Sequence, residues 1–148
     1  FGRDGNNLVF ASQLMAGQRV KREKRDIYLS AARSYLFNLA LSRRVADGSW
    51  CEPDRQGEPA SGWLAGISRG GERIGDADAG FSDWHEGLAR MGVKAMRRVL
   101  AVHAEGLDYS WGADHLVLDF ALPAGAYATS LLREVAAYRS RPGGTADG

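Results

Sequence analysis

The chain has 148 residues, of which 45% are hydrophobic and 25% are charged, which is the composition of an ordinary globular protein with one domain or parts of two. No apolar run approaches the roughly 20 residues that a membrane-spanning helix needs. Cys51 is the only cysteine, which excludes an internal disulfide and a zinc site built from several thiolates, and fits a reduced, cytoplasmic setting.

Charge is distributed unevenly along the chain. The formal net charge is +1, but residues 1–45 hold nine Lys or Arg against three acidic residues, a local charge of +6. Five of these cations fall within seven residues, and three more arginines lie in the next predicted helix. The eight are Arg19, Lys21, Arg22, Lys24, Arg25, Arg33, Arg43 and Arg44. Such a run favours phosphate binding, although most charge runs are simply solvated faces, and both interpretations remain open.

Two helices are predicted in the first third of the chain. Glycine and asparagine in the opening FGRDGNN favour turns, and Asn7 is the expected N-cap of a short helix over residues 8–16. A longer helix is predicted from Asp26 or Ser30 to about Ala46, because apolar residues recur there at three- and four-residue spacing. Its buried stripe comprises Leu29, Ala32, Leu36, Leu39 and Ala40.

The rest of the chain is predicted to be mixed. Residues 47–82 contain two of the four prolines and show no period, which indicates a long irregular connection. A helix is expected from Ser82 or Asp83, followed by one or two helical turns over residues 93–98. The period then changes, and the remaining expected elements are strands at 99–104 and 115–122 with turns marked by Gly106 and Gly112, a helix at 126–138 and a disordered tail at 139–148. Together these elements predict an α+β fold.

Neither a catalytic motif nor a metal site is evident from residue types and spacing. The histidines His85, His103 and His115 are scattered, and none has a metal-ligand partner at helical or hairpin spacing. The glycine-rich SRGGERIG lacks the Gly-Lys-Ser/Thr that would hold a nucleotide phosphate. These signals predict no metal, no cofactor and no particular class of enzyme.

Three stretches resemble the TruD-type tRNA pseudouridine synthase family. FGRDGNN resembles the family signature Phe-Gly-x-x-Gly-x-Asn, and LSAARSYLFN at 29–38 looks like the family's long helix. LDFALPAGAYATSLLREV, from Leu118 to Val135, is similar to its C-terminal strand, turn and helix. The order and approximate spacing agree, and PASGWLAG at 59–66 and the Arg97–Arg98 pair add weaker matches.

The resemblance implies an activity and an organisation. Family members isomerise uridine to pseudouridine in tRNA, typically at position 13, without a cofactor or metal. An aspartate attacks the nucleoside, the glycosidic C–N bond breaks, and the uracil is rejoined through carbon. The resemblance also implies tRNA as the partner, a cytoplasmic location and a monomer at full length. Residues 1–102 would form the inserted RNA-binding domain, and residues 103–138 a C-terminal hairpin and helix of the catalytic sheet.

Tyr127 is the residue to which the resemblance assigns a substrate contact. In the family, an aromatic residue in the C-terminal turn contacts the substrate, and Tyr127 occupies the matching position. A ring between Gly125 and a helix N-terminus could reach an extruded base, whose stacking contributes roughly 1–3 kcal/mol. The alternative is that Tyr127 is an ordinary core residue.

The sequence departs from the family pattern in two ways. The family nucleophile lies in a Gly-x-Lys-Asp-type segment upstream of the Phe-Gly motif, and Asp4, Asp26 and Asp119 match no such context, so this chain alone is expected to be inactive. A β-rich stretch that usually follows the Asp-Gly-Ser-Trp region is missing after Trp50, so the inserted domain is expected to be shortened. The alternatives from other classes are a non-catalytic RNA-binding module and a small interaction domain with a solvated basic face.

Overall fold

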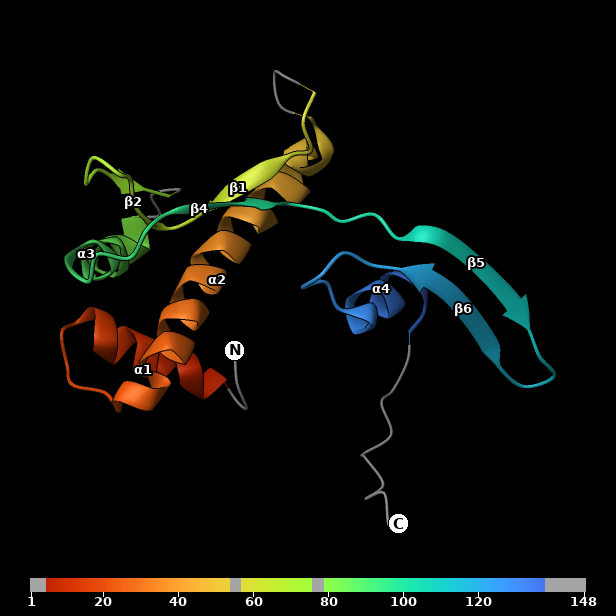
Figure 1. The fold of residues 1–148 in the computed structure, drawn as a ribbon, viewed down its shortest axis with the longest axis horizontal. Helices are drawn as coiled ribbons and strands as arrows, with labels where there is room; N and C mark the ends of the chain where they lie inside the picture. Colours follow the sequence, from red (N-terminus) through yellow and green to blue (C-terminus); the bar gives the residue numbers. More distant parts are fainter. Residues whose placement is uncertain (1–4, 54–56, 76–78, 138–148) are drawn as a thin grey trace, which may run out of the picture. The chain divides into compact units, whose positions relative to one another are not determined.

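The computed structural model describes residues 5–53, 57–75 and 79–137, and the chain divides into two compact units, Phe1–Ala101 and Val102–Gly148 (Figure 1). The described part holds four α-helices and three two-stranded antiparallel sheets, which confirms an α+β fold. None of the helices in these ranges is long and apolar enough to cross a membrane. The first four residues of FGRDGNN and the predicted tail at 139–148 lie outside the described residues.

Three helices enclose the core of the first unit: α1 (Asn6–Met15), α2 (Arg22–Asp47) and α3 (Ser82–Arg90) (Figure 1). Met15 of α1 and Leu88 of α3 are almost completely buried. Gly87 lets these helices approach closely, because a Cβ there would lie only 2.8 Å from the Met15 sulfur. The buried cluster consists of Ala11, Leu14, Met15, Tyr28, Ala32, Leu36, Ala65, Trp84 and Leu88.

The two predicted N-terminal helices exist, but both begin earlier than expected. Gly5, with φ 73°, precedes the first residue of α1, so the prediction of Asn7 as the N-cap is wrong. Helix α2 begins at Arg22 rather than at Asp26 or Ser30, because the turn that precedes it ends with Lys21 in an extended conformation. Of the predicted stripe, Ala32 and Leu36 are buried and the other three members are half-buried.

Short strands occupy the region that was predicted to be irregular. Strand β1 (Ser61–Leu64) pairs with β4 (Met96–Val99), and β2 (Gly66–Ile67) pairs with β3 (Arg73–Ile74). The expected helical turns at 93–98 are wrong. Ile67 N–H donates to the Val93 carbonyl at 2.8 Å, and Ala95 N–H donates to the Ile67 carbonyl at 3.0 Å. Pairing between segments distant in sequence therefore fixes an extended backbone here. Short 3₁₀ helices lie at Ser49–Cys51 and Ala79–Phe81.

The second unit is a β-hairpin, β5 (Glu105–Trp111) and β6 (Leu116–Ala121), followed by α4 (Ala128–Val135). The strand predicted at 99–104 is wrong, because residues 101–104 have no regular structure and β5 begins only at Glu105. Gly106, with φ 61°, lies at a register shift within β5 rather than at a turn. Gly112 does mark the hairpin turn, where its N–H donates to the His115 carbonyl at 2.8 Å.

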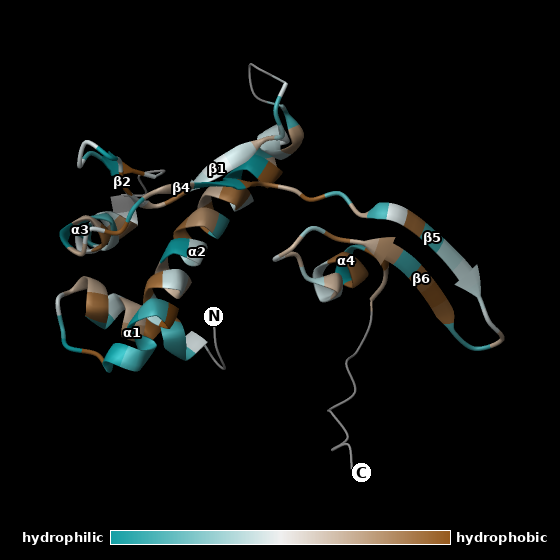
Figure 2. Cartoon of the chain, in the orientation of Figure 1, coloured by the Kyte–Doolittle hydropathy of each residue, from teal (hydrophilic) through white to brown (hydrophobic). Residues whose placement is uncertain are grey.

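The described part of the second unit contains no buried residue. Hydrophobic residues nevertheless cover much of β6 and α4 (Figure 2). On β5, Tyr109 is 67% exposed and Trp111 is 73% exposed, and these rings lie opposite Leu118 and Leu116 of β6. One face of the hairpin is therefore aromatic and aliphatic, yet remains in contact with solvent.

Candidate nucleic-acid interface

The basic segment, defined here as residues 19–25, joins α1 to the first turn of α2. All five of its cations are exposed, and they are Arg19, Lys21, Arg22, Lys24 and Arg25. The first turn of α2 contains only one acidic residue, Glu23, and Lys21 provides no side-chain cap. Cations near a helix N-terminus are unfavourable by roughly 0.3–1 kcal/mol each, since the helix dipole is positive there. The cations of the basic segment therefore destabilise the start of α2 slightly. They also form a positively charged surface that can bind anions such as phosphate.

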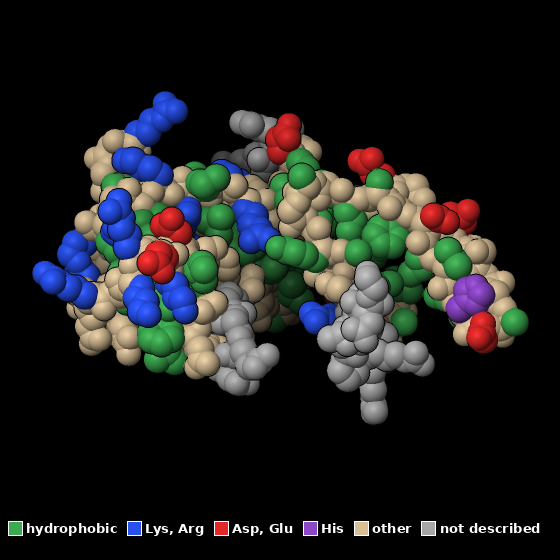
Figure 3. Space-filling view, turned by 60° about the horizontal axis from the view of Figure 1, so that its bottom comes forward, with side chains coloured by type: hydrophobic (Ala, Val, Ile, Leu, Met, Phe, Trp, Pro, Cys, Tyr) green, Lys and Arg blue, Asp and Glu red, His purple; other side chains and the backbone are tan. Residues whose placement is uncertain are grey.

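The surface view shows the same concentration of charge. Lys and Arg side chains gather over the first unit, with few acidic side chains among them on the face shown (Figure 3). The turn that presents the basic segment is fixed by backbone contacts: Gln18 N–H donates to the Gln13 carbonyl at 2.9 Å, and Gly17 has φ 86°. Arg90 of α3 donates to the Met15 carbonyl at 2.5 Å. The start of the segment is thus held at the end of α1.

Arg33 differs from the other predicted cations because its guanidinium faces the protein. Its Nε donates to the Ala65 carbonyl at 2.9 Å, and its Nη2 donates to the Lys94 carbonyl at 2.9 Å. Burial lowers the pKa of Arg33 from its ordinary value. The guanidinium therefore links α2 to the backbone of two chain segments that follow much later. Sequence periodicity had placed Arg33 off the buried stripe and did not indicate this role.

Arg43 and Arg44 lie near the other end of α2. Arg43 is exposed and Arg44 is half-buried. At 1.5 Å per residue, about 27 Å of helix separates Arg43 from Arg25, so these arginines and the basic segment do not form one patch. Asp47, close to Arg44, accepts hydrogen bonds from the Ser49 hydroxyl at 2.7 Å and the Ser49 N–H at 2.9 Å. These bonds, the hydroxyl first, lower the pKa of Asp47, and Arg44 contributes less.

Tyr127 stands at the N-cap position of α4. Its backbone is extended, with φ −115° and ψ 124°, and Gly125 precedes it in the turn with φ 88°. The ring is 72% exposed. Ser130 N–H donates to the Tyr127 carbonyl at 2.9 Å, which anchors the backbone of the residue while its ring stays accessible. The ring is therefore accessible from solvent in the part of the chain that the structure describes.

Two further cations lie on the ribbon formed by β1 and β4, outside the set predicted to bind RNA. The guanidinium carbon of Arg97 lies 5.1 Å from the ring centre of Trp63, its cross-strand neighbour. The guanidinium carbon of Arg98 lies 5.2 Å from the ring centre of Phe37 in α2. The sequence signal that could have indicated this ribbon is the Arg97–Arg98 pair in a stretch, 91–104, that contains no acidic residue.

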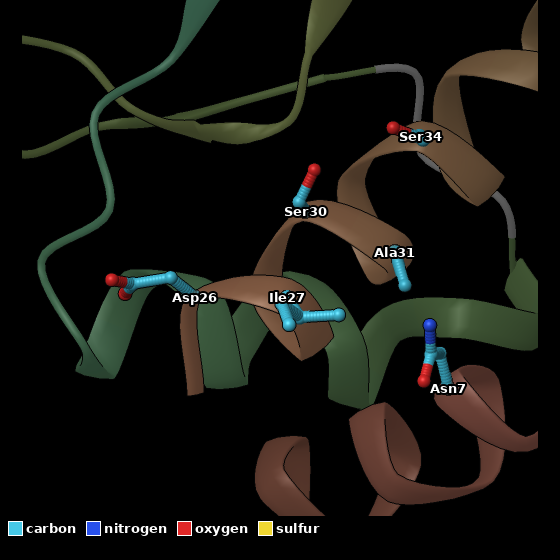
Figure 4. Close-up of a pocket in the computed structure, with 6 residues that line it drawn as sticks. All are labelled: Asn7, Asp26, Ile27, Ser30, Ala31 and Ser34. Carbon is cyan, nitrogen blue, oxygen red and sulfur yellow. The ribbon is translucent and has the colours of Figure 1, made fainter. Parts of the chain in front are cut away.

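A hollow of about 490 Å³ lies between α1 and the first half of α2 (Figure 4). Its lining residues are Asn7, Asp26, Ile27, Ser30, Ala31 and Ser34. Asn7 reaches from α1 toward Ala31 of α2 (Figure 4). Among the described lining residues, only Asp26 is charged, and its carboxylate would repel a phosphate.

The sequence of the chain is similar to those of known proteins. A family model described as tRNA pseudouridine synthase D (TruD) matches residues 77–135. The tRNA pseudouridine synthase D of Legionella pneumophila (strain Lens) is 34% identical over 175 residues, covering 93% of this chain and 52% of that protein. The Cellvibrio japonicus protein of the same name is 40% identical over 147 residues, covering 91% of this chain and 44% of that protein. The Shewanella oneidensis protein is 36% identical and covers 94% of this chain.

The chain is thus related to the pseudouridine synthases over more than nine tenths of its length. The chain is similar in sequence to members of the TruD family, and the resemblance predicted from the sequence motifs is confirmed. The chain spans about half the length of the curated relatives it matches.

Proposed function

We propose that this chain forms the RNA-binding part and a piece of the substrate pocket of a tRNA pseudouridine synthase, which isomerises uridine, at the family-typical position 13, in tRNA. The observation that carries the proposal is the sequence identity of 34–40% to proteins named tRNA pseudouridine synthase D over more than nine tenths of the chain. The enzyme acts in the cytoplasm as a monomer and needs neither a metal nor a cofactor.

The division of labour follows the two compact units. Residues 1–102 act as the inserted RNA-binding domain, and residues 103–138 complete the catalytic sheet with a hairpin and a helix. Exposed hydrophobic residues on β5, β6 and α4 support this assignment, because a sheet face with Tyr109 and Trp111 in solvent calls for a covering layer. The remainder of the catalytic sheet is the layer that we propose.

We infer that the first domain is shorter than its counterpart in the Legionella protein, whereas the alignment with the Cellvibrio protein extends over only 147 residues. The alignment with the Legionella protein extends over 175 residues, whereas 93% of 148 residues is about 138. About 37 aligned positions therefore have no counterpart in this chain. We assign this difference to the region after Trp50, where the 3₁₀ helix Ser49–Cys51 leads toward β1 without an intervening sheet among the described residues.

Two sets of residues carry the proposed contacts with tRNA. The cations of the basic segment, with Arg43 and Arg44, neutralise phosphates, and each phosphate contact releases counterions and so adds affinity. Arg33 belongs to the proposed set only if its guanidinium can also reach a phosphate while it donates to the backbone. Tyr127 stacks on the extruded uracil or its sugar. Extrusion costs a few kcal/mol, and a preordered ring offsets part of that cost.

The proposal is tested by producing the chain together with a segment that carries the family's Lys-Asp sequence, and by measuring pseudouridine in unmodified tRNA. We expect formation at a single uridine. Tight tRNA binding without any pseudouridine would favour the non-catalytic RNA-binding module instead.

A further inference from the structure

The outer face of the β1–β4 ribbon carries an arginine stacked on a tryptophan. Arg97 lies 5.1 Å above the ring of Trp63, and it also donates a hydrogen bond to the Ser61 hydroxyl. The two contacts hold the guanidinium over the indole. Arg97 is exposed, so the side of the guanidinium that faces away from Trp63 is accessible to a ligand.

The register of the ribbon determines which side chains share this face. Gly62 faces α2, since a Cβ there would lie 3.1 Å from the Phe37 ring. Arg98, directly opposite Gly62, covers the same ring. Successive side chains of a strand alternate between faces, so Trp63 and Arg97 point away from α2.

The two sequence stretches that form the ribbon are positive and partly apolar. Neither 59–68 nor 91–104 contains an acidic residue, whereas the second stretch contains Lys94 and Arg97, with Arg98 on the other face. Val99, on the same face as Arg97, is 44% exposed. Cations interleaved with aromatic and apolar groups favour a ligand that has both a negative backbone and flat faces.

We infer that the Trp63–Arg97 pair is a stacking platform for an unpaired base of RNA, separate from the basic segment and from Tyr127. Unpaired bases stack on aromatic rings and on guanidinium planes, and an arginine already ordered by an indole offers such a plane at little further loss of entropy. The identification of the ligand as RNA rests on the proposed function. The placement of the platform rests on the ribbon itself.

The test uses the 148-residue chain and a labelled short oligouridylate, which has no base pairs, at fixed ionic strength. We expect Trp63→Leu to weaken binding by roughly 5- to 150-fold, and to abolish the part of the tryptophan fluorescence quenching that the oligonucleotide causes at this site. Trp50→Leu is the matched control, because Trp50 is 38% exposed but lies in the 3₁₀ helix after α2. It should bind as the parent chain does.

A second pair of variants separates stacking from charge and from folding. Arg97→Lys keeps the charge but removes the plane, and should weaken oligouridylate binding without changing its salt dependence. Arg98→Lys makes the same change on the other face of the strand and should have no effect. Three results would contradict the proposed stacking site. They are equal affinities of the Arg97→Lys and Arg98→Lys variants, unchanged binding by the Trp63→Leu variant, and no binding of oligouridylate by the parent chain. Pseudouridine formation is measured separately from oligouridylate binding. Absence of pseudouridine in the test of the proposed function would contradict the proposed enzyme activity, but it would not contradict the stacking site.

Discussion

Tyr127 is exposed and anchored through its backbone, so its ring can be changed with little effect on folding. In the active enzyme, we expect Tyr127→Ala to lower kcat/KM by about 5- to 150-fold, the equivalent of 1–3 kcal/mol of stacking in the transition state. Tyr127→Phe keeps the ring and should lose little. Affinity for tRNA should barely change, because phosphate contacts supply most of it.

The same variants must be followed by thermal denaturation. If Tyr127 packed in a core once the catalytic sheet is complete, Tyr127→Ala would cost several kcal/mol of stability and reduce activity and melting temperature together. Loss of activity with an unchanged melting temperature supports the substrate contact. Parallel loss of both would assign the ring to the core.

Arg33 leads to the opposite expectation. Arg33→Met keeps the length of the side chain but removes its hydrogen bonds to the carbonyls of Ala65 and Lys94. Bonds from a charged donor contribute roughly 1.5–3 kcal/mol, so we expect a clear fall in melting temperature with a small effect on tRNA binding. Arg25→Met, on the exposed first turn of α2, should leave stability intact. A flatter salt dependence for Arg33→Met at unchanged stability would instead identify Arg33 as a phosphate ligand.

Individual residues show where reasoning from sequence succeeds and where it stops. Periodicity predicted Ala32 and Leu36 as core residues, because helical spacing alone decides which side of α2 they occupy. The same reasoning placed Arg33 off the buried stripe, among the cations expected to bind RNA. Its partners, Ala65 and Lys94, lie 32 and 61 residues further along the chain, and no local pattern contains that information.

Among the elements, the basic segment is expected to lower the stability of α2 and is proposed to raise the affinity for tRNA. Replacing Lys21, Arg22, Lys24 and Arg25 with Gln should weaken binding to all tRNAs similarly, and should reduce the slope of log affinity against log salt by up to roughly 0.7–0.9 per lost phosphate contact. The melting temperature should stay the same or rise slightly, since cations are unfavourable at the start of α2.

Arg69→Gln is the control for this experiment, because Arg69 is exposed in the turn between β2 and β3, outside the basic segment. An unchanged salt slope in the fourfold variant would mean that the segment is only a solvated face. A fall in the melting temperature of the fourfold variant would mean that the cations of the basic segment stabilise the fold by contacts that outweigh their unfavourable interaction with the helix dipole.

Helices and strands that depend on contacts between residues close in sequence were predicted from the sequence, and those that depend on distant residues were not. The helices α1 and α3 and strand β6 follow from short-range signals and were found close to their predicted limits, whereas α2 begins at Arg22, four residues or more before its predicted start. Strands β1 and β4 were missed, because Gly62 and Trp63 sit in a stretch rich in glycine and proline and acquire a strand partner only at Arg97–Arg98. Pairing over more than thirty residues overrides local propensity.

The whole molecule combines a unit with a buried core and a unit without one. In the first unit, the buried cluster joins α1, α2 and α3. In the second, β5 and β6 form a two-stranded sheet whose apolar face and outer edges remain exposed. An isolated two-stranded hairpin is marginally stable in water, and open edges favour association between chains. The resemblance to the TruD family implies that the hairpin belongs to a larger sheet, which would cover this face and these edges.

That assignment leads to the prediction for catalysis. The reaction needs a nucleophile that the family supplies from a Lys-Asp segment, and none of the aspartates in this sequence matches that context. We expect the purified 148-residue chain to bind tRNA but to form no pseudouridine, and we expect activity only when the Lys-Asp segment is present, in the same polypeptide or as a separate one. The measurement is pseudouridine content after incubation with unmodified tRNA. If the 148-residue chain formed pseudouridine by itself, the nucleophile would lie within this chain. Asp119, on the strand that leads to Tyr127, would then be the first residue to replace. Asp119→Asn would then abolish the activity, whereas in the enzyme proposed here it should leave the chemistry intact.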